Sequence, residues 1–514
     1  MDTVEIYKKA LEQYKAKNYD EALKFLEEVK LAAPNWKKPL LLQAYILREQ
    51  NKTAELFLFV QKILPTFEEK NFISDALNLL GVACMKLALP DSATELLRLA
   101  GETAKDNSEA CDEISNAILA ANASEKFSAD DFKKLYAEYK KYLSDIEPYP
   151  KKFYNHKRIR VGFLSADFRI HPVIKWSWAL IRNLDKKIFV TYCYSSVGKA
   201  DIVTENIAAT VENWRDISKL EDAQAAETIR NDEIDILFDL SGHTSGNRLR
   251  VAAYRPASIQ ISGIGYMNST GLECFDYFLS DEICAGDPNY FTEKLIRLPH
   301  SHICYEPSIK IEPASFPPCL KNGFVTFGSF NNLAKVTDET LLLWRGILDQ
   351  VHSSKLVLKG KICSIDSGRA ILRDRLKRLS FDLARVEMRP YSPDYLEQYR
   401  DIDIALDTMP YNGGLTTCEA LFMGVPVVSI RGRRHGSRFG ASILVNAGVK
   451  ELVVENDINY VRRAVQLGNS PELIGAYHSG LRANLLKSPL MDVKNYMREL
   501  ESGYCAIWQN FCTI

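Results

Sequence analysis

The chain has 514 residues, of which 46% are hydrophobic and 25% charged, and its formal net charge at pH 7 is −1. This composition is that of a globular protein, and the length predicts two or three domains rather than one core. The balanced charge excludes an overall field that would favour nucleic acid or an anionic membrane.

The chain begins with charged residues and shows no sign of a membrane anchor. The first residues, Met1-Asp2-Thr3-Val4-Glu5, lack the basic and then apolar stretch of a signal peptide. No apolar run reaches the roughly 18 residues of a membrane span. We therefore expect a cytoplasmic protein that does not bind membranes.

Residues 1–125 have the three- and four-residue apolar spacing of helices, and they carry an internal repeat. Ala10 lies twelve residues before Ala22, and Gly81 lies twelve residues before Ala93. The two pairs are offset by 71 residues, close to two periods of about 34 residues. The region resembles tetratricopeptide repeats, which would offer a concave surface to a protein partner. The alternative is a helical extension that only covers a neighbouring domain.

Residues 126–156 predict a polar connector with a helix over 132–142, and the pattern then changes. Short apolar segments alternate with stretches of helical length, which is typical of doubly wound parallel sheets. Strands are expected at 158–165, 189–194 and 234–240 in a first lobe, 157–315, and at 324–330, 355–359, 386–389, 402–407 and 425–430 in a second lobe, 316–514. The proline-rich segment 312–318 predicts a linker. Ligands of such sheets bind beyond the carboxyl ends of the strands, so a cleft between the lobes is expected.

The clearest chemical signal is the segment 406–421, where a strand ends and a glycine-containing loop leads into a helix. Its candidate ligand-binding residues are Asn412, Gly413, Gly414, Thr416, Thr417 and Glu419. Glycines allow close backbone approach, and hydroxyls with the free N–H groups of a helix start bind phosphate. Glu419, in the first helical turn, is suited to accept ribose hydroxyls. The segment is not a Walker A loop, and the alternative is an ordinary strand-to-helix turn.

Two further polar loops follow the first strand of each lobe. Gly328–Lys335 contains Asn332 and Lys335, and a lysine at this position is suited to neutralise a diphosphate leaving group. The alternative is a lysine that is only solvated. Ser165–Val173 contains His171, a candidate base across the cleft or else a structural histidine.

Another two loops complete the set. Asp239–Thr244 carries His243, and 264–271 carries Ile264, Gly265 and Tyr266, with glycines that permit close contact with a sugar. Five polar loops thus leave five apolar strands over two sheets, which is the layout of a ligand cleft between domains.

The sequence predicts no metal site. The eleven cysteines are scattered without a Cys-x-x-Cys pair, which favours reduced, mostly buried thiols over a disulfide framework or a zinc site. Asp401-Ile402-Asp403 looks like a metal-binding DxD motif, but it alternates with apolar residues inside a predicted strand. A lysine and a helix N-terminus can supply the positive field instead, so no metal or other cofactor is expected.

The combination of these loops resembles one known family. From Arg158 onward the chain is similar to the catalytic region of the O-linked N-acetylglucosamine transferases and of the related plant Spindly proteins, which are O-fucosyltransferases. The similarity covers about 350 residues and rests on VGFLSADFRIHP, DLSGHT, RPASIQISGIGY, NGFVTFGSFNNLAKVT and ALDTMPYNGGLTTCEALFMGVPVV. The tetratricopeptide-like N-terminus fits a short, bacterial-type form of this family.

The resemblance implies a GT-B fold and an inverting, metal-independent transferase whose C-terminal lobe binds the nucleotide sugar. By position in the motifs, Lys335 is implied to contact the diphosphate and Asn332 to line the nucleotide. His171 is implied to lie at the reaction centre, and Ile264 and Gly265 near the donor sugar. The residues implied to grip the diphosphate and ribose are Gly414, Thr416, Thr417 and Glu419.

Several positions depart from the family pattern and bear on the choice of donor. Tyr395 stands where a histidine often stacks on the base, and a tyrosine can also stack. Gln398 stands where the animal enzyme has a base-contacting arginine. Other departures are Gly414, Leu415, Met267 and Glu419, the last shared with Spindly. The basic segment 431–438, ending at Arg438, either contacts the diphosphate or is a solvated turn.

We therefore expect α/α repeats followed by two Rossmann-like lobes of the α/β GT-B fold. The expected activity moves N-acetylglucosamine from UDP-N-acetylglucosamine to serine or threonine hydroxyls of a protein held by the repeats. The alternatives are the same fold using GDP-fucose or another sugar nucleotide, a catalytically inactive repeat scaffold, and a sugar-nucleotide epimerase.

Overall fold

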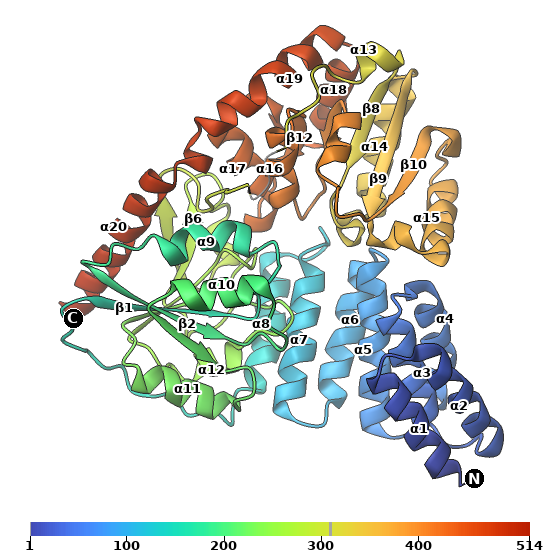
Figure 1. The fold of residues 1–514 in the computed structure, drawn as a ribbon, viewed down its shortest axis with the longest axis vertical. Helices are drawn as coiled ribbons and strands as arrows, with labels where there is room; N and C mark the ends of the chain where they lie inside the picture. The colour runs from blue at the N-terminus through green and yellow to red at the C-terminus, as the bar shows by residue number, and fades with distance from the viewer. Residues whose placement is uncertain (1, 308–310, 514) are drawn as a thin grey trace.

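The computed structural model describes residues 2–307 and 311–513, with a helical array first and two sheet-containing lobes after it (Figure 1). The array consists of α1 (Thr3–Lys15), α2 (Tyr19–Ala32), α3 (Lys38–Glu49), α4 (Thr53–Ile63) with the 3-10 turn η1 (Leu64–Thr66), α5 (Lys70–Lys86), α6 (Pro90–Thr103) and α7 (Asn107–Ala121). Neighbouring helices in this order pack against each other.

Small residues let these helices approach closely. Ala10 and Ala22 are fully buried in one cluster between α1 and α2. At Gly81, an added methyl group would lie 2.6 Å from the Leu97 side chain of α6, so a larger residue would push the helices apart. The small residues identified at twelve-residue spacing therefore mark close packing between paired helices.

The connector joins the array to the first lobe through α8 (Ala129–Lys141), which is capped by Ser128. The Tyr136 hydroxyl of α8 donates a 3.1 Å hydrogen bond to the Ser269 carbonyl of the first lobe. Gly271, with φ +71°, lies directly under the Tyr136 ring, and a side chain there would overlap it. The array and the first lobe therefore share a packed interface.

The first lobe contains a seven-stranded parallel sheet in the order β3-β2-β1-β4-β5-β6-β7. Its strands are β1 (Ile159–Ser165), β2 (Phe189–Ser195), β3 (Asn213–Asp216), β4 (Ile236–Asp239), β5 (Ile259–Ser262), β6 (Tyr277–Asp281) and β7 (Lys294–Leu298). The helices are α9 (Ile174–Arg182), α10 (Ile202–Thr210), α11 (Asp222–Asn231), α12 (Leu249–Ala253) and the 3-10 turn η2 (Pro288–Tyr290). The first strand of the chain, β1, lies inside the sheet and pairs Phe163 with Cys193 of β2 on one side and with Phe238 of β4 on the other.

The second lobe contains a six-stranded parallel sheet in the order β10-β9-β8-β11-β12-β13. Its strands are β8 (Val325–Ser329), β9 (Ser354–Gly360), β10 (Val386–Pro390), β11 (Ile404–Leu406), β12 (Val427–Ile430) and β13 (Val453–Val454). Its α-helices are α13 (Cys319–Asn322), α14 (Asp338–Gln350), α15 (Asp366–Arg378), α16 (Leu415–Phe422), α17 (Phe439–Asn446), α18 (Asp457–Gly468) and α19 (Pro471–Leu486). Its 3-10 turns are η3 (Leu333–Lys335), η4 (Lys361–Ser364), η5 (Leu383–Arg385), η6 (Glu397–Asp401), η7 (His435–Ser437), η8 (Lys450–Leu452) and η9 (Pro489–Met491). The predicted class, helices followed by two doubly wound lobes, is confirmed.

Both sheets reverse their winding direction next to their first strand. In the first sheet the reversal lies between β1 and β4, and in the second it lies between β8 and β11. Loops diverge at such a point and leave a crevice at the carboxyl ends of the strands. The four loops that follow these strands carry His171, His243, Lys335 and the glycine-containing segment.

The last helix corrects the predicted lobe boundary. We expected residues 316–514 to belong to the second lobe, but α20 (Val493–Cys512) contacts β7 and α9 of the first lobe. The Asp185 N–H donates to Glu501 at 2.8 Å, and the Tyr504 ring packs against Phe189. In Figure 1 this helix (red) runs from the second lobe down along the first. A strap of this kind leaves no composition signal, because its apolar face looks the same whichever lobe covers it.

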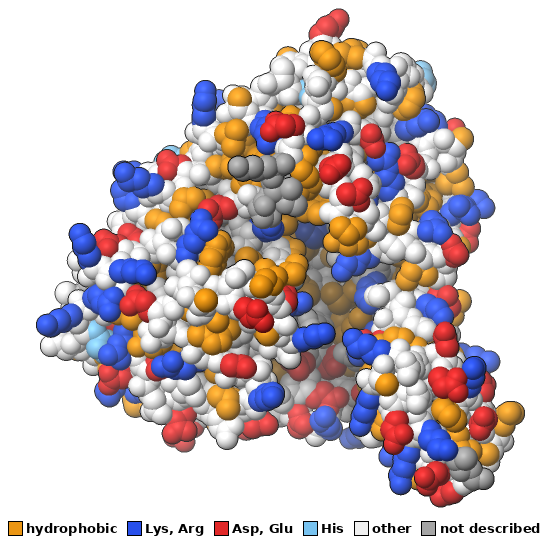
Figure 2. Space-filling model, in the orientation of Figure 1, with side chains coloured by type: hydrophobic (Ala, Val, Ile, Leu, Met, Phe, Trp, Pro, Cys, Tyr) orange, Lys and Arg blue, Asp and Glu red, His pale blue; other side chains and the backbone are white. Residues whose placement is uncertain are grey.

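The helical array also touches the second lobe, where α4 contacts α15 and α5 contacts η3. Figure 2 shows the molecule hollowed where the array faces the two lobes, with lysine and arginine side chains around the opening. Among the helices of residues 2–307 and 311–513, none is long and apolar enough to cross a membrane.

Candidate functional site

The two loops at the reversal point of the second sheet lie side by side. β8 and β11 are neighbouring parallel strands, with Ile404 paired to Phe327, so the following loops leave the sheet at the same edge. The Thr416 hydroxyl at the start of α16 donates to Asn331 Oδ1 in the β8 loop at 2.8 Å. We call the segment Asp407–Gly414, which leads from β11 to α16, the glycine loop.

Asp407 holds the glycine loop in shape. One of its carboxylate oxygens accepts the Gly413 N–H at 2.6 Å, and the other accepts the Ser429 hydroxyl at 2.6 Å. Burial raises the pKa of Asp407 to about 6, although these hydrogen bonds oppose the shift. A methyl group at Gly413 would lie 2.5 Å from the Thr416 hydroxyl and 2.8 Å from Asn331 Oδ1, so any side chain here would displace these two groups.

The start of α16 offers unpaired hydrogen-bond donors. The backbone N–H groups of Leu415 and Thr416 have no acceptor within residues 2–307 and 311–513, and the backbone bonds of the helix begin at Thr417. The Thr417 hydroxyl donates to the Gly413 carbonyl at 2.9 Å. Asn412 Oδ1 is a buried acceptor that is likewise unpaired in the described part of the chain. Free N–H groups at a helix N-terminus attract anions, and phosphate above all.

Lys335 points at the same loop. Its ammonium group donates to the Asn412 carbonyl at 3.1 Å and lies 3.5 Å from the centre of the Tyr411 ring. Burial lowers the pKa of Lys335 from 10.5 to about 8, and the attraction of Asp407 opposes this shift. A partly desolvated cation next to free helix N–H groups forms a site for a polyanion such as a diphosphate.

Glu419, buried in α16, and the half-buried Tyr395 form a hydrogen-bonded pair. The Tyr395 hydroxyl donates to Glu419 at 2.5 Å. Burial raises the pKa of Glu419 to about 7, although Tyr395 and the charge of Lys175 lower it. The ring of Tyr395 also stacks on Tyr391 at a centroid distance of 6.5 Å. The pair presents an aromatic face and a polar acceptor at one edge of the loop.

The helix α9 of the first lobe faces this arrangement across the interlobe boundary. Lys175, whose charge acts on Glu419, belongs to α9. A methyl group at Gly414 would lie 3.7 Å from Trp176 of α9 and 3.6 Å from Phe439 of α17, both within ordinary contact distance. The candidate site is therefore enclosed by both lobes.

His171 lies in the loop that follows β1 and is about one third exposed. Its Nδ1 lies 3.4 Å from an Asp167 carboxylate oxygen. Burial lowers the pKa of His171, Asp167 opposes the shift, and the charges of Arg169 and Lys361 lower it further. Lys361 lies in η4 of the second lobe, so the His171 loop faces that lobe.

Of the two adjacent asparagines in this loop, Asn331 rather than Asn332 contacts the start of α16. Asn332 is exposed, and its side chain accepts the Ala334 N–H at 3.2 Å, which caps η3. Asn331 is buried and accepts the Thr416 hydroxyl. Two adjacent asparagines in one sequence cannot be told apart by pattern, and only the direction of the loop decides between them.

His243 and Tyr266 are structural rather than part of an open sugar site, which corrects their predicted place. His243 is fully buried between the Ser115 hydroxyl of α7, at 3.0 Å, and the Thr270 carbonyl, at 2.8 Å. Burial lowers its pKa to about 4, so the ring is neutral. The Tyr266 hydroxyl accepts from the Asn122 amide at 2.9 Å, also at the junction with the helical array. Sequence could not show this, because it depends on how the array docks.

Ile264 and Gly265 form a tight turn beyond β5. Ile264 has φ +66°, which is unusual for a branched residue. An added methyl at Gly265 would lie 1.8 Å from the Leu240 carbonyl, so the turn is pressed against the end of β4. The side chain of Ile264 is buried, and the segment presents backbone rather than side chains.

Arg438 is used between the lobes. Its guanidinium group donates to the Ile283 carbonyl of the first lobe at 2.7 Å and to the Gly432 carbonyl at 3.0 Å. Burial lowers its pKa. These contacts join the segment 431–438 to the first lobe, and the contact of Arg438 with a diphosphate stays a prediction.

The two carboxylates of the DxD-like segment do not converge. Asp401 pairs with Arg389 at 2.7 Å. Asp403 is fully buried and accepts the backbone N–H groups of Cys319, at 2.8 Å, and Thr326, at 2.7 Å. Both therefore have structural partners at the start of the second sheet.

Comparison with known proteins agrees with this geometry. Residues 138–306 and 318–500 match the model of glycosyl transferase family 41. The chain is 38% identical over 391 residues to the probable UDP-N-acetylglucosamine–peptide N-acetylglucosaminyltransferase SPINDLY of Solanum lycopersicum. It is 26% identical over 376 residues to the corresponding probable enzyme SEC of Arabidopsis thaliana. These alignments cover 74% and 70% of this chain but 41% and 38% of the relatives, so the chain spans less than half of their length.

A solved structure covers the full length. The O-GlcNAc transferase of Thermobaculum terrenum, determined as a lysine-to-methionine variant, superimposes with a TM-score of 0.89 at 27% identity. The match covers 100% of this chain and 99% of that one, so the helical array and both lobes share its arrangement.

Proposed function

Because the chain belongs to glycosyl transferase family 41, we propose that it is a protein O-glycosyltransferase that uses UDP-N-acetylglucosamine and modifies serine or threonine hydroxyls. The observation that carries the proposal is the convergence of Lys335, the unpaired N–H groups of α16 and the glycine loop at one sheet edge. This arrangement suits the diphosphate of a nucleotide sugar. The adjacent Tyr395–Glu419 pair suits its base and ribose.

The proposed reaction is a displacement at the anomeric carbon. The acceptor oxygen forms a bond to this carbon from the face opposite the nucleotide, so the configuration inverts. The bond from the carbon to the diphosphate oxygen breaks, and the nucleoside diphosphate leaves with both electrons. Lys335 and the start of α16 would stabilise the charge that develops on the departing diphosphate. These groups supply the positive field without a metal ion.

The acceptor proton needs a recipient on the first-lobe side. His171 is the candidate base. Its lowered pKa favours the neutral ring, which can accept a proton, and its loop faces the second lobe. The helical array would lead the acceptor to this cleft, because α5 contacts the turn that carries Lys335. An acceptor held along the array would thus arrive next to the donor.

A donor panel tests the proposal. Purified protein is incubated with UDP-N-acetylglucosamine, UDP-glucose or GDP-fucose without added divalent metal, and nucleotide release and self-modification are followed by mass spectrometry. We expect turnover with UDP-N-acetylglucosamine that is lost in Lys335→Ala and kept in Lys355→Ala, whose ammonium lies over the Phe324 ring. If none of the three donors is turned over, the inactive scaffold is favoured.

GDP-fucose is the second candidate donor. The chain is more similar to the SPINDLY relative, at 38% identity, than to SEC, at 26%. Spindly proteins also have a glutamate at the position of Glu419. Faster turnover with GDP-fucose than with UDP-N-acetylglucosamine would move the assignment to this donor.

A further inference from the structure

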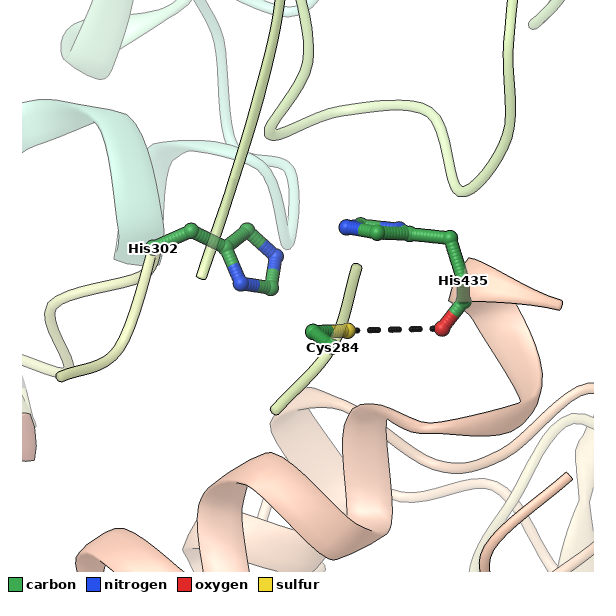
Figure 3. A group of neighbouring side chains, drawn as sticks. All are labelled: Cys284, His302 and His435. Carbon is green, nitrogen blue, oxygen red and sulfur yellow. Dashed lines mark hydrogen bonds between the residues drawn. The ribbon is translucent and has the colours of Figure 1, made fainter. Parts of the chain in front are cut away.

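Three buried side chains converge where the two lobes meet, outside the candidate donor site. Cys284 follows β6, His302 follows β7, and His435 begins η7 of the second lobe. The Cys284 Sγ and a ring nitrogen of each histidine all lie within 4.8 Å of one another (Figure 3). We call these three residues the interlobe cluster.

The histidine ring nitrogens of the cluster are poorly satisfied by hydrogen bonds. Within the described residues His302 Nε2 has no hydrogen-bond partner, and the His435 ring makes no well-aligned hydrogen bond, although the Met267 backbone acts on it; each side chain is only 1% exposed. A buried polar atom without a partner is destabilising. The cluster therefore contains nitrogen lone pairs that could coordinate a bound cation.

The position of Asp281 resembles the support of a metal-bound histidine. His302 Nδ1 lies 2.5 Å from a carboxylate oxygen of Asp281, which is fully buried. With the proton on Nδ1, the lone pair of Nε2 points into the cluster. Metal-binding histidines commonly donate their other N–H to a carboxylate in this way. Asp281 also accepts the Cys284 N–H at 2.6 Å and the Ser442 hydroxyl at 2.8 Å, so one carboxylate orients two members of the cluster.

Aromatic rings enclose the cluster. Phe278, Phe291 and Phe439 pack edge-on against the His435 ring at centroid distances of 5.0, 6.0 and 5.3 Å. Phe439 also contacts the His302 ring at 5.6 Å. An apolar shell of this kind excludes bulk water and would leave protein atoms as the main ligands of an ion.

We propose that the interlobe cluster binds one Zn²⁺ ion through Cys284 Sγ, His302 Nε2 and a ring nitrogen of His435. One thiolate and two imidazoles form a ligand set that suits zinc, and one trapped water would complete the four ligands. On binding, the Cys284 thiol would release its proton to solvent and give up its 3.3 Å hydrogen bond to the His435 carbonyl.

The geometry requires a small contraction. Zinc lies about 2.0–2.1 Å from nitrogen and about 2.3 Å from sulfur, which places ligand atoms of a tetrahedron roughly 3.3–3.6 Å apart. Side-chain rotations supply this closure, because the ligand atoms already lie within 4.8 Å. The ion would join two loops of the first lobe to one turn of the second. We therefore assign it the role of a clamp between the lobes.

Spacing in the sequence could not reveal this site, and the proposal replaces our expectation that the chain has no zinc site. Cys284 and His302 are 18 residues apart, and His435 follows 133 residues later. Only the packing of the two lobes brings the three side chains together.

Zinc content tests the proposal directly and needs no donor. The full chain is stripped with chelator, incubated with zinc sulfate, freed of excess metal and measured by mass spectrometry of the metal, with thermal unfolding alongside. We expect one zinc per chain and a higher Tm. Cobalt in place of zinc should give the absorption of a tetrahedral site and a sulfur-to-cobalt charge-transfer band.

Two variants and one control assign the metal to the cluster. Cys284→Ala and His435→Phe should lose the zinc and the Tm shift, and the second keeps an aromatic ring among its phenylalanine neighbours. Cys193→Ala removes a fully buried thiol in β2 and should retain the zinc. The proposal is overturned if the wild-type chain retains no zinc after loading, or if its cobalt form shows no sulfur-to-cobalt charge-transfer band. Equal zinc content in Cys284→Ala and Cys193→Ala would overturn it too.

Discussion

The Tyr395 hydroxyl donates a hydrogen bond of 2.5 Å to the carboxylate of Glu419, which is 3% exposed at the start of α16. Burial raises the pKa of this carboxyl from 4.5 to about 7, and the hydrogen bond with Tyr395 limits the rise. A group of this kind changes its charge near neutral pH, so it links the stability of the site to pH.

Replacing Glu419 by glutamine should change the pH dependence of stability. The folded chain holds the Glu419 proton more tightly than the unfolded chain, so wild-type stability falls as pH rises from about 4.5 to about 7. The full effect is at most about 3 kcal/mol. In urea unfolding without ligand, we expect the free energy of unfolding of Glu419→Gln to rise relative to that of the wild type as pH increases over this range. The exposed Glu12→Gln serves as control, and a difference that does not vary with pH would contradict the pKa shift.

Donor affinity should fall as pH rises above about 8. Lys335 has a pKa of about 8 in the free protein and must be protonated to bind a diphosphate, so affinity is full at lower pH. Above this value the UDP affinity should fall by about tenfold per pH unit. Lys335→Arg keeps its charge and should bind without this decline. Constant wild-type affinity well above pH 8 would contradict the lowered pKa of Lys335 in the free protein.

Gly413→Ala should weaken UDP binding by at least about tenfold, or about 1.4 kcal/mol. The new methyl group would lie 2.5 Å from the Thr416 hydroxyl and would separate it from Asn331. Gly475→Ala is the matched control, because no atom lies within 4 Å of its added methyl group. In the helix α19 this change should be neutral or stabilise the protein by up to about 1 kcal/mol. Unchanged UDP affinity in Gly413→Ala would remove the glycine loop from the site.

His171→Ala should keep UDP affinity and reduce transfer by about 10²–10⁴-fold, the usual contribution of a general base. His171 lies beside Asp167 in the first lobe, whereas the groups proposed to bind the diphosphate lie in the second. The two effects are separated by calorimetry with UDP and by turnover with the preferred donor. Loss of UDP binding rather than turnover would exclude the role of base.

Ser115→Ala should destabilise the chain by about 1–3 kcal/mol while leaving UDP affinity unchanged. The change removes the 3.0 Å partner of the buried His243 ring at the junction of α7 and the first lobe. Urea unfolding measures the loss, and Ser479→Ala, at an exposed hydroxyl of α19, should have no comparable effect. A loss of donor affinity with unchanged stability would indicate that His243 belongs to the donor site after all.

Sequence periodicity predicted the fold because it depends on local and repeated signals. Apolar runs marked the eight strands that were predicted by range to within one or two residues, but β3, β5, β6, β7 and β13 were not among them. The twelve-residue spacing of Ala10 and Ala22 marked a close helix pair. The path of α20 did not follow from the same signals, because an amphipathic helix does not specify which lobe covers it.

The site was predicted in part. Lys335, Gly413 and Thr416 lie where polar loops leave predicted strands, and the structure brings them together. The contact of Asn331 with α16 was not predicted, because it depends on side-chain direction. The burial of His243 was not predicted, because it depends on how the helical array docks on the first lobe. The interlobe cluster depends on contacts between three distant segments, which no spacing rule describes.

Calorimetric titration with UDP and with GDP, without added divalent metal, tests the central claim most directly. We expect wild-type protein and Lys355→Ala to bind UDP, and Lys335→Ala to lose this binding. Tighter binding of GDP would keep the site and change the donor. If neither nucleotide binds, or if Lys335→Ala binds UDP as well as the wild type does, the proposed donor site is wrong.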